Sequence, residues 1–95
     1  MQIRWSPDAA ADLESIVDYI RRDDPAAAQR VGQEIYDRLG LPGTFPYGGK
    51  RGRVDGTREL PLPPLPFIVV YRVLEHGDAV EIVNVIHGAQ RWPPV

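Results

Sequence analysis

The chain has 95 residues, with 43% hydrophobic and 25% charged residues and a formal net charge of −2, a composition typical of one small globular domain. Its lack of cysteine excludes disulfide bonds, cysteine-ligated zinc and thiol catalysis. Its apolar runs are shorter than the ~18 residues that a membrane span needs, and no secretion signal opens the sequence. We therefore expect a single domain, residues 1–95, in the cytoplasm.

The N-terminal part is predicted to form a strand followed by two helices. Residues 2–5 alternate in character, as in a strand. Ser-Pro-Asp at 6–8 is a helix start signal, because serine caps free amides, proline fits the first helical position and aspartate complements the helix dipole. Asp-Asp-Pro at 23–25 repeats this signal, and Gly40 lies where a left-handed residue would end the second helix. The short connection predicts an antiparallel helical hairpin.

The C-terminal part is predicted to form a long loop and three strands. Residues 41–56 are rich in proline, glycine and basic residues and are expected to be irregular. Residues 57–62, 67–74 and 79–87 have the composition of strands, the last two joined by a short turn. The order β-α-α-β-β-β predicts an α+β fold, in which the helical hairpin packs on one face of a mostly antiparallel sheet.

A local basic patch lies at the end of the predicted loop. Lys50, Arg51, Arg53 and Arg58 fall within nine positions, opposed only by Asp55. Such a cluster on an acidic protein indicates a surface for an anionic target or for phosphate. The alternative is a solvated loop whose charges serve only solubility.

Further polar candidates fall on the predicted strands or just after them. Two arginines and a histidine on one open surface would suit a phosphodiester, because guanidinium groups bind phosphate oxygens and imidazole exchanges a proton near neutral pH. Strand alternation places His87 on the face of Glu81. The alternative for this histidine is a local structural hydrogen bond. The candidates are Arg58, Glu59, Arg72, His87 and Arg91.

Other motifs predict neither a cofactor nor a metal. Two histidines without cysteine do not make a metal-binding constellation. The glycines at 48–49 are followed by basic residues and not by a helix signal, unlike a phosphate-binding loop. The proline-rich segment 61–66 contains PxxP patterns, but its place between two predicted strands favours a rigid connection over a peptide ligand.

An ordered set of short motifs resembles the RelE/ParE toxin superfamily of bacterial type II toxin–antitoxin modules. The resemblance extends over nearly the whole chain and implies the same α+β fold. It also implies an antitoxin partner bound in a hetero-oligomer. The motifs are Trp5-Ser6-Pro7, Asp12-Leu13, Tyr19-Ile20, Pro25, Phe45-Pro46, Gly56-Thr57-Arg58-Glu59-Leu60, Val69-Val70-Tyr71-Arg72-Val73 and Val85-Ile86-His87-Gly88-Ala89-Gln90-Arg91-Trp92-Pro93.

The resemblance implies two branches with different targets. RelE-like members cut messenger RNA on the ribosome, and ParE-like members act on DNA gyrase. The cutting branch has an arginine three residues before the position of Tyr71, where this chain has Ile68, and a tyrosine near the C-terminus, where this chain has none after Tyr71. These differences favour the ParE-like branch.

Each branch implies a different role for the polar candidates. In a ribonuclease the catalytic set would be Arg58, Arg72 and His87. In a ParE-like protein the basic residues would contact the target or its phosphates, and these are Lys50, Arg51, Arg53, Arg58, Arg72 and Arg91.

Overall fold

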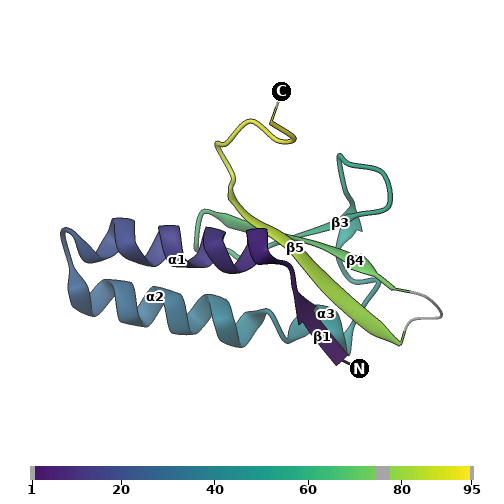
Figure 1. Ribbon diagram of the computed structural model, residues 1–95, viewed down its shortest axis with the longest axis horizontal. Coiled ribbons are helices and arrows are strands. Elements are labelled where there is room, and N and C mark those ends of the chain that lie inside the picture. Colours follow the sequence, from purple (N-terminus) through teal and green to yellow (C-terminus); the bar gives the residue numbers. More distant parts are fainter. Residues whose placement is uncertain (1, 75–77, 95) are drawn as a thin grey trace.

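The computed structural model describes residues 2–74 and 78–94. In these residues a five-stranded sheet lies against a hairpin of two long helices, which covers one of its faces (Figure 1). The strand order is β1-β5-β4-β3-β2. The elements are β1 (Gln2–Trp5), α1 (Pro7–Arg21), α2 (Pro25–Arg38), α3 (Leu41–Thr44), β2 (Lys50–Arg51), β3 (Arg58–Pro61), β4 (Phe67–Val73) and β5 (Ala79–His87).

Both helices begin where the sequence predicts, and for the predicted reason. The Ser6 hydroxyl accepts the Ala9 amide at 3.0 Å and donates to the Val83 carbonyl at 2.7 Å. The Asp24 carboxylate accepts the Ala27 amide at 3.0 Å. A proline occupies the first turn of each helix. These caps satisfy amides that have no partner within the helix, and the antiparallel hairpin is confirmed (Figure 1).

The core lies between the hairpin and the helix-facing side of the sheet. The middle residues of β4 and β5 that point toward the helices are buried, and α1 contributes Ala9 to the same cluster. Apolar packing on one side of the sheet therefore joins the two layers. The buried cluster consists of Ala9, Ile35, Leu39, Leu62, Val69, Tyr71, Val80, Ile82 and Val85.

The sheet has one parallel pair, at its N-terminal edge. β1 runs parallel to β5, from Gln2 opposite Ala79 to Trp5 opposite Ile82, whereas all other pairs are antiparallel. Beyond this pairing, α1 closes the free edge of β5. The Asp12 carboxylate accepts the Val85 amide at 3.0 Å, so this strand edge is satisfied by a helix side chain.

The expectation of a continuous irregular loop over residues 41–56 is wrong in part. The chain forms α3 and then β2, which pairs with β3. The expected left-handed end of α2 is also wrong, because Gly40 has φ −69° and ψ −22° and leads directly into α3. None of the described helices is long and apolar enough to cross a lipid bilayer.

A β-bulge in β5 changes which side chains share a face. Val70 is opposite Asn84, but Tyr71 is opposite Ile82, so β5 has one extra residue at Val83. The extra residue reverses the alternation along the strand. Glu81 therefore lies on the face of Arg72, and His87 lies on the opposite face beside Phe67. The expectation that His87 and Glu81 share a face is wrong for this reason.

Candidate functional site

Most of the predicted basic residues lie around the two strands at the β2 edge of the sheet. Lys50 and Arg51 form β2, Arg53 lies in the turn that follows it, and Arg58 begins β3. Lys50 is opposite Glu59, and Arg51 is opposite Arg58. The antiparallel pairing therefore places Arg51 and Arg58 side by side on one face.

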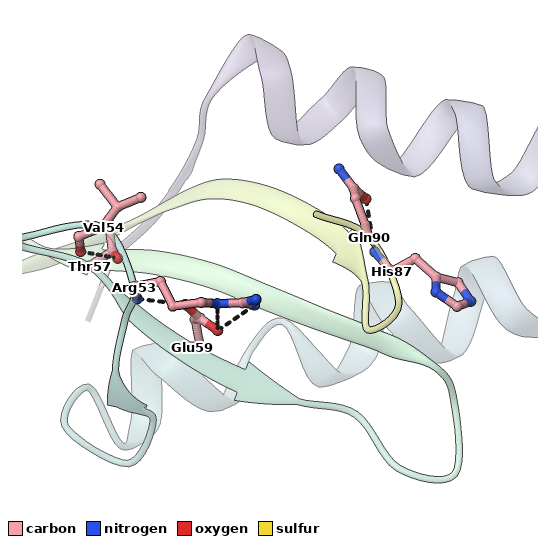
Figure 2. Close-up of polar contacts among 6 residues, drawn as sticks. All are labelled: Arg53, Val54, Thr57, Glu59, His87 and Gln90. Carbon is pink, nitrogen blue, oxygen red and sulfur yellow. Dashed lines mark hydrogen bonds and ion pairs between the residues drawn. The ribbon is translucent and has the colours of Figure 1, made fainter. Parts of the chain in front are cut away.

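Arg53 is held by a buried carboxylate. Glu59 has no exposed surface, and its oxygens accept the Arg53 amide at 2.8 Å and the guanidinium Nη2 at 2.9 Å (Figure 2). These hydrogen bonds hold the pKa of Glu59 below its usual range, although burial acts in the opposite direction. The same hydrogen bonds raise the pKa of Arg53. This arginine thus has an internal partner that fixes the turn.

Arg58 is anchored at one nitrogen and lies over an aromatic ring. Its Nη1 donates to the Gly49 carbonyl at 2.8 Å, and its guanidinium carbon lies 5.0 Å from the centre of the Tyr47 ring, a cation–π distance. Arg51 and Arg58 together line a hollow of about 390 Å³. Its other lining residues are Asp55, Gly56, Thr57 and Val73.

A buried tyrosine holds the loop in front of this hollow. Tyr71 is fully buried, and its hydroxyl donates to the Pro46 carbonyl at 2.9 Å and accepts the Gly49 amide at 2.8 Å. The sequence analysis missed this role, and it also missed Tyr47. The run Phe-Pro-Tyr at 45–47, directly before the basic patch, is the signal that could have found Tyr47.

Arg72 lies on the sheet face opposite to this hollow. It forms an ion pair with Glu81, the residue across from it on β5. The Arg72 Nε donates to the Glu81 carboxylate at 3.2 Å, and both side chains are partly exposed. Such a cross-strand pair stabilises the sheet modestly. The ion pair also occupies hydrogen-bond donors of the Arg72 guanidinium.

His87 makes local contacts at the end of β5. Its Nδ1 accepts the Ala89 amide at 3.0 Å, and its ring is edge-on to Phe67 with 5.7 Å between ring centres. Its backbone amide donates to the Gln90 side chain at 3.1 Å (Figure 2). These contacts match the structural alternative considered for this histidine. Arg91 follows in the C-terminal segment, where it is exposed.

Arg58, Arg72 and His87 do not converge on a common site. Arg58 and Arg72 extend from opposite faces of the sheet, because Arg58 is opposite Tyr71, the neighbour of Arg72 in β4. Arg72 and His87 are also on opposite faces, and they are separated along the strands by five residue pairs, roughly 16 Å at the usual rise of a strand. The proposed catalytic set is therefore spread over both faces.

Comparisons with known proteins place this arrangement in a family. The family model described as the ParE toxin of the type II toxin–antitoxin system parDE matches residues 3–92. The chain is 40% identical to the protein Y4kP of Sinorhizobium fredii over 94 residues, which cover 99% of this chain and 95% of that protein. It is 34% identical to toxin RelE2 of Caulobacter vibrioides over 91 residues, which cover 94% and 97% of the two chains.

A solved structure agrees with the sequence comparisons. A chain of the chromosomal ParDE toxin–antitoxin system from P. aeruginosa superposes with a TM-score of 0.80 at 30% identity, covering 92% of this chain and 95% of that one. The match includes the helical hairpin and the sheet that position the residues described above. The chain belongs to the ParE toxin family of type II toxin–antitoxin systems.

Proposed function

We propose that this toxin arrests growth by binding DNA gyrase and that a cognate antitoxin neutralises it by direct contact in the cytoplasm. The observation that carries the proposal is the dispersal of Arg58, Arg72 and His87 over both faces of the sheet. Catalysis requires groups positioned around one reacting centre, whereas inhibition by binding requires only a complementary surface. The Ile68 side chain and the lack of a tyrosine after Tyr71 support the same branch.

The antitoxin part of the proposal is supported by an apolar groove beside the helical hairpin. The groove has a volume of about 480 Å³ and is lined by α1, α2 and the start of β4, including Ile16, Tyr19 and Phe67. Tyr19 is 71% exposed. An exposed apolar groove of this kind is stabilised when a partner segment covers it. The solved ParDE system that this chain resembles gives the class of partner.

Gyrase inhibition is tested with purified gyrase and the full chain. We expect the chain to inhibit supercoiling of relaxed plasmid, and we expect addition of the antitoxin encoded beside it to restore supercoiling. His87→Ala is the informative variant, because the His87 ring packs on Phe67 and its Nδ1 accepts the Ala89 amide, and loss of these structural contacts is expected to leave inhibition unchanged. Normal supercoiling at saturating toxin would overturn the gyrase proposal.

A ribosome-dependent messenger RNA endoribonuclease is the second candidate. It is favoured by the 34% identity to the Caulobacter protein named RelE2. This function requires codon-phased cleavage of messenger RNA on purified ribosomes, and His87→Ala would abolish it if imidazole transfers the proton. Intact transcripts during growth arrest would exclude this candidate. Harmless expression of the folded chain would exclude both targets.

A further inference from the structure

Two large aromatic side chains are exposed in the segment that leads into the β2 edge of the sheet. Phe45 and Tyr47 are each 64% exposed, in the short segment between α3 and β2. Tyr47 contacts the Arg58 guanidinium, and Arg58 is beside Arg51. We call these four residues, Phe45, Tyr47, Arg51 and Arg58, the Tyr47 surface. Exposed aromatics grouped with cations mark an interaction surface more than a solubility surface.

The Tyr47 surface is held in place from the core. The buried Tyr71 hydroxyl bonds to Pro46 and Gly49, the residues that flank Tyr47 and Gly48. Arg58 then donates to the Gly49 carbonyl from the outside. A methyl group added at Gly49 would lie 2.7 Å from the Tyr71 oxygen, so the loop approaches the tyrosine as closely as its atoms allow. The aromatic and cationic groups are therefore preorganised, which lowers the entropic cost of binding.

The arginines of this surface retain donors for an anion. Within residues 2–74 and 78–94, Nη1 is the Arg58 side-chain nitrogen that donates to carbonyls, which leaves Nε and Nη2 as donors. In the described part of the chain, the Arg51 side chain has no ion pair, and both arginines line the 390 Å³ hollow. Guanidinium groups in this position bind phosphate oxygens through paired hydrogen bonds. Asp55 lines the same hollow and opposes an anion there.

We propose that the Tyr47 surface binds single-stranded nucleic acid, with a base stacked on the exposed aromatic side chains and the adjoining phosphodiester at Arg51 and Arg58. Alternating aromatic and basic groups are the features that recognise single strands, because every base has a flat face and every nucleotide has a charge. A duplex keeps its bases stacked inside, and an acidic peptide has no flat ring for Tyr47. The proposal does not depend on gyrase, because the binding is measured with the toxin alone.

The test is fluorescence anisotropy of a labelled ten-nucleotide oligothymidylate titrated with the purified full chain. We expect Tyr47→Leu to weaken binding about tenfold and Tyr47→Phe, which keeps the ring, to restore it. Arg51→Ala should weaken binding. It should also make the slope of log K against log salt concentration less steep by about 0.7, the value for one phosphate contact on a single strand. Asp55→Asn removes the opposing charge and should tighten binding.

Matched control variants distinguish binding at the Tyr47 surface from a general effect of losing an exposed aromatic ring or a positive charge. Tyr36→Leu removes an aromatic that is 62% exposed on α2, and Arg30→Ala removes an exposed cation on the same helix. Both should leave the affinity within twofold. Tyr71→Phe removes only the buried hydroxyl, and we expect weaker binding by a folded protein, checked by circular dichroism. Unchanged binding by the folded Tyr71→Phe variant would overturn the positioning role.

Three competitors identify the ligand class. Oligouridylate of the same length tells whether RNA or DNA is preferred, and binding of either one supports the proposal. The duplex of the same length and polyglutamate of equal charge should compete weakly. Equal competition by polyglutamate, together with insensitivity to Tyr47→Leu, would overturn the proposal in favour of an acidic protein segment. No measurable binding of either oligonucleotide at low salt would also overturn it.

Discussion

Glu59 determines, at the scale of a single residue, how the basic edge of the sheet is built. Its carboxylate lies on the face away from the helices, opposite Val70, and is fully buried. A buried carboxylate keeps its charge only when hydrogen bonds and opposite charges replace water. Arg53 supplies both, and cross-strand Lys50 adds a favourable charge. One of the basic residues of the patch, Arg53, therefore stabilises the fold.

We expect Glu59→Gln to lower the free energy of unfolding at pH 7 by about 1–3 kcal/mol, because the hydrogen bonds from Arg53 lose their charged acceptor. The pKa of Glu59 is lower in the folded chain than in the unfolded chain. The stability that it contributes is thus fully present above the unfolded value of about 4.3 and is lost as the pH falls through the folded value. Urea denaturation from pH 7 to pH 3 should show the variant and the parent converging.

The control for this measurement is the ion pair between Arg72 and Glu81, which lie across from each other on β4 and β5. Glu81 pairs with Arg72 at a partly exposed site, where a salt bridge is worth about 1 kcal/mol or less. Glu81→Gln should therefore cost clearly less than Glu59→Gln. A pH-independent difference between Glu59→Gln and the parent would contradict a charged Glu59 in the folded state.

At the scale of the element, α1 is joined to the sheet by polar side chains at its N-terminus and in its first half. Ser6 caps α1 and also donates to the β5 carbonyl of Val83. Further along α1, Asp12 accepts the Val85 amide and the Asn84 side chain. Where β1 ends, these hydrogen bonds satisfy β5 backbone groups that a neighbouring strand would otherwise bind. The edge of β5 is therefore unavailable for addition of another strand at these groups.

The N-cap of α2 can be tested against an internal control. Asp24→Ala should lower stability by about 0.5–2 kcal/mol, the usual loss for a helix N-cap, because its carboxylate bonds to the Ala27 amide. Asp23→Ala removes the same charge one residue earlier and should change stability by less than about 0.5 kcal/mol. Thermal unfolding of both variants measures the difference. Equal losses would show that charge, and not the cap, is responsible.

The elements also show why local sequence signals predict some features and not others. Helix starts depend on residues within one turn, so Ser6 and Asp24 could be identified from the sequence. The face of His87 depends on the bulge at Val83, which arises from the pairing of β5 with β4. A prediction from strict alternation of side chains along a strand does not include an extra residue. The sequence leaves open whether Arg72 and His87 share a surface, and the bulge puts them on opposite faces of the sheet.

At the scale of the whole molecule, the α+β class and the helical hairpin on a sheet could be predicted, because hydrophobic periodicity and element order specify them. The parallel position of β1 could not, because it depends on contacts with the far end of the chain. The sequence identifies which basic residues are close together along the chain, but it does not give their arrangement in the sheet. Arg51 and Arg58 do come together, whereas Arg53 has an internal partner and Arg72 lies on the other face.

The pairing of β1 with β5 has a consequence for how the toxin is made. Gln2 is opposite Ala79, so β1 can pair, and this side of the sheet can form, only after β5 has been synthesised. Bringing β1 and β5 together costs chain entropy, and this cost is offset only when both strands are present and can pair. Buried Val80, Ile82 and Val85 also complete the core only at that stage.

Nascent chains stalled before residue 79 should therefore be degraded rapidly by added protease, whereas chains stalled with β5 outside the exit tunnel should resist it. Protease resistance in the shorter chains would contradict this order of events. On this account the sheet, and with it the folded chain, is completed only after β5 has left the exit tunnel.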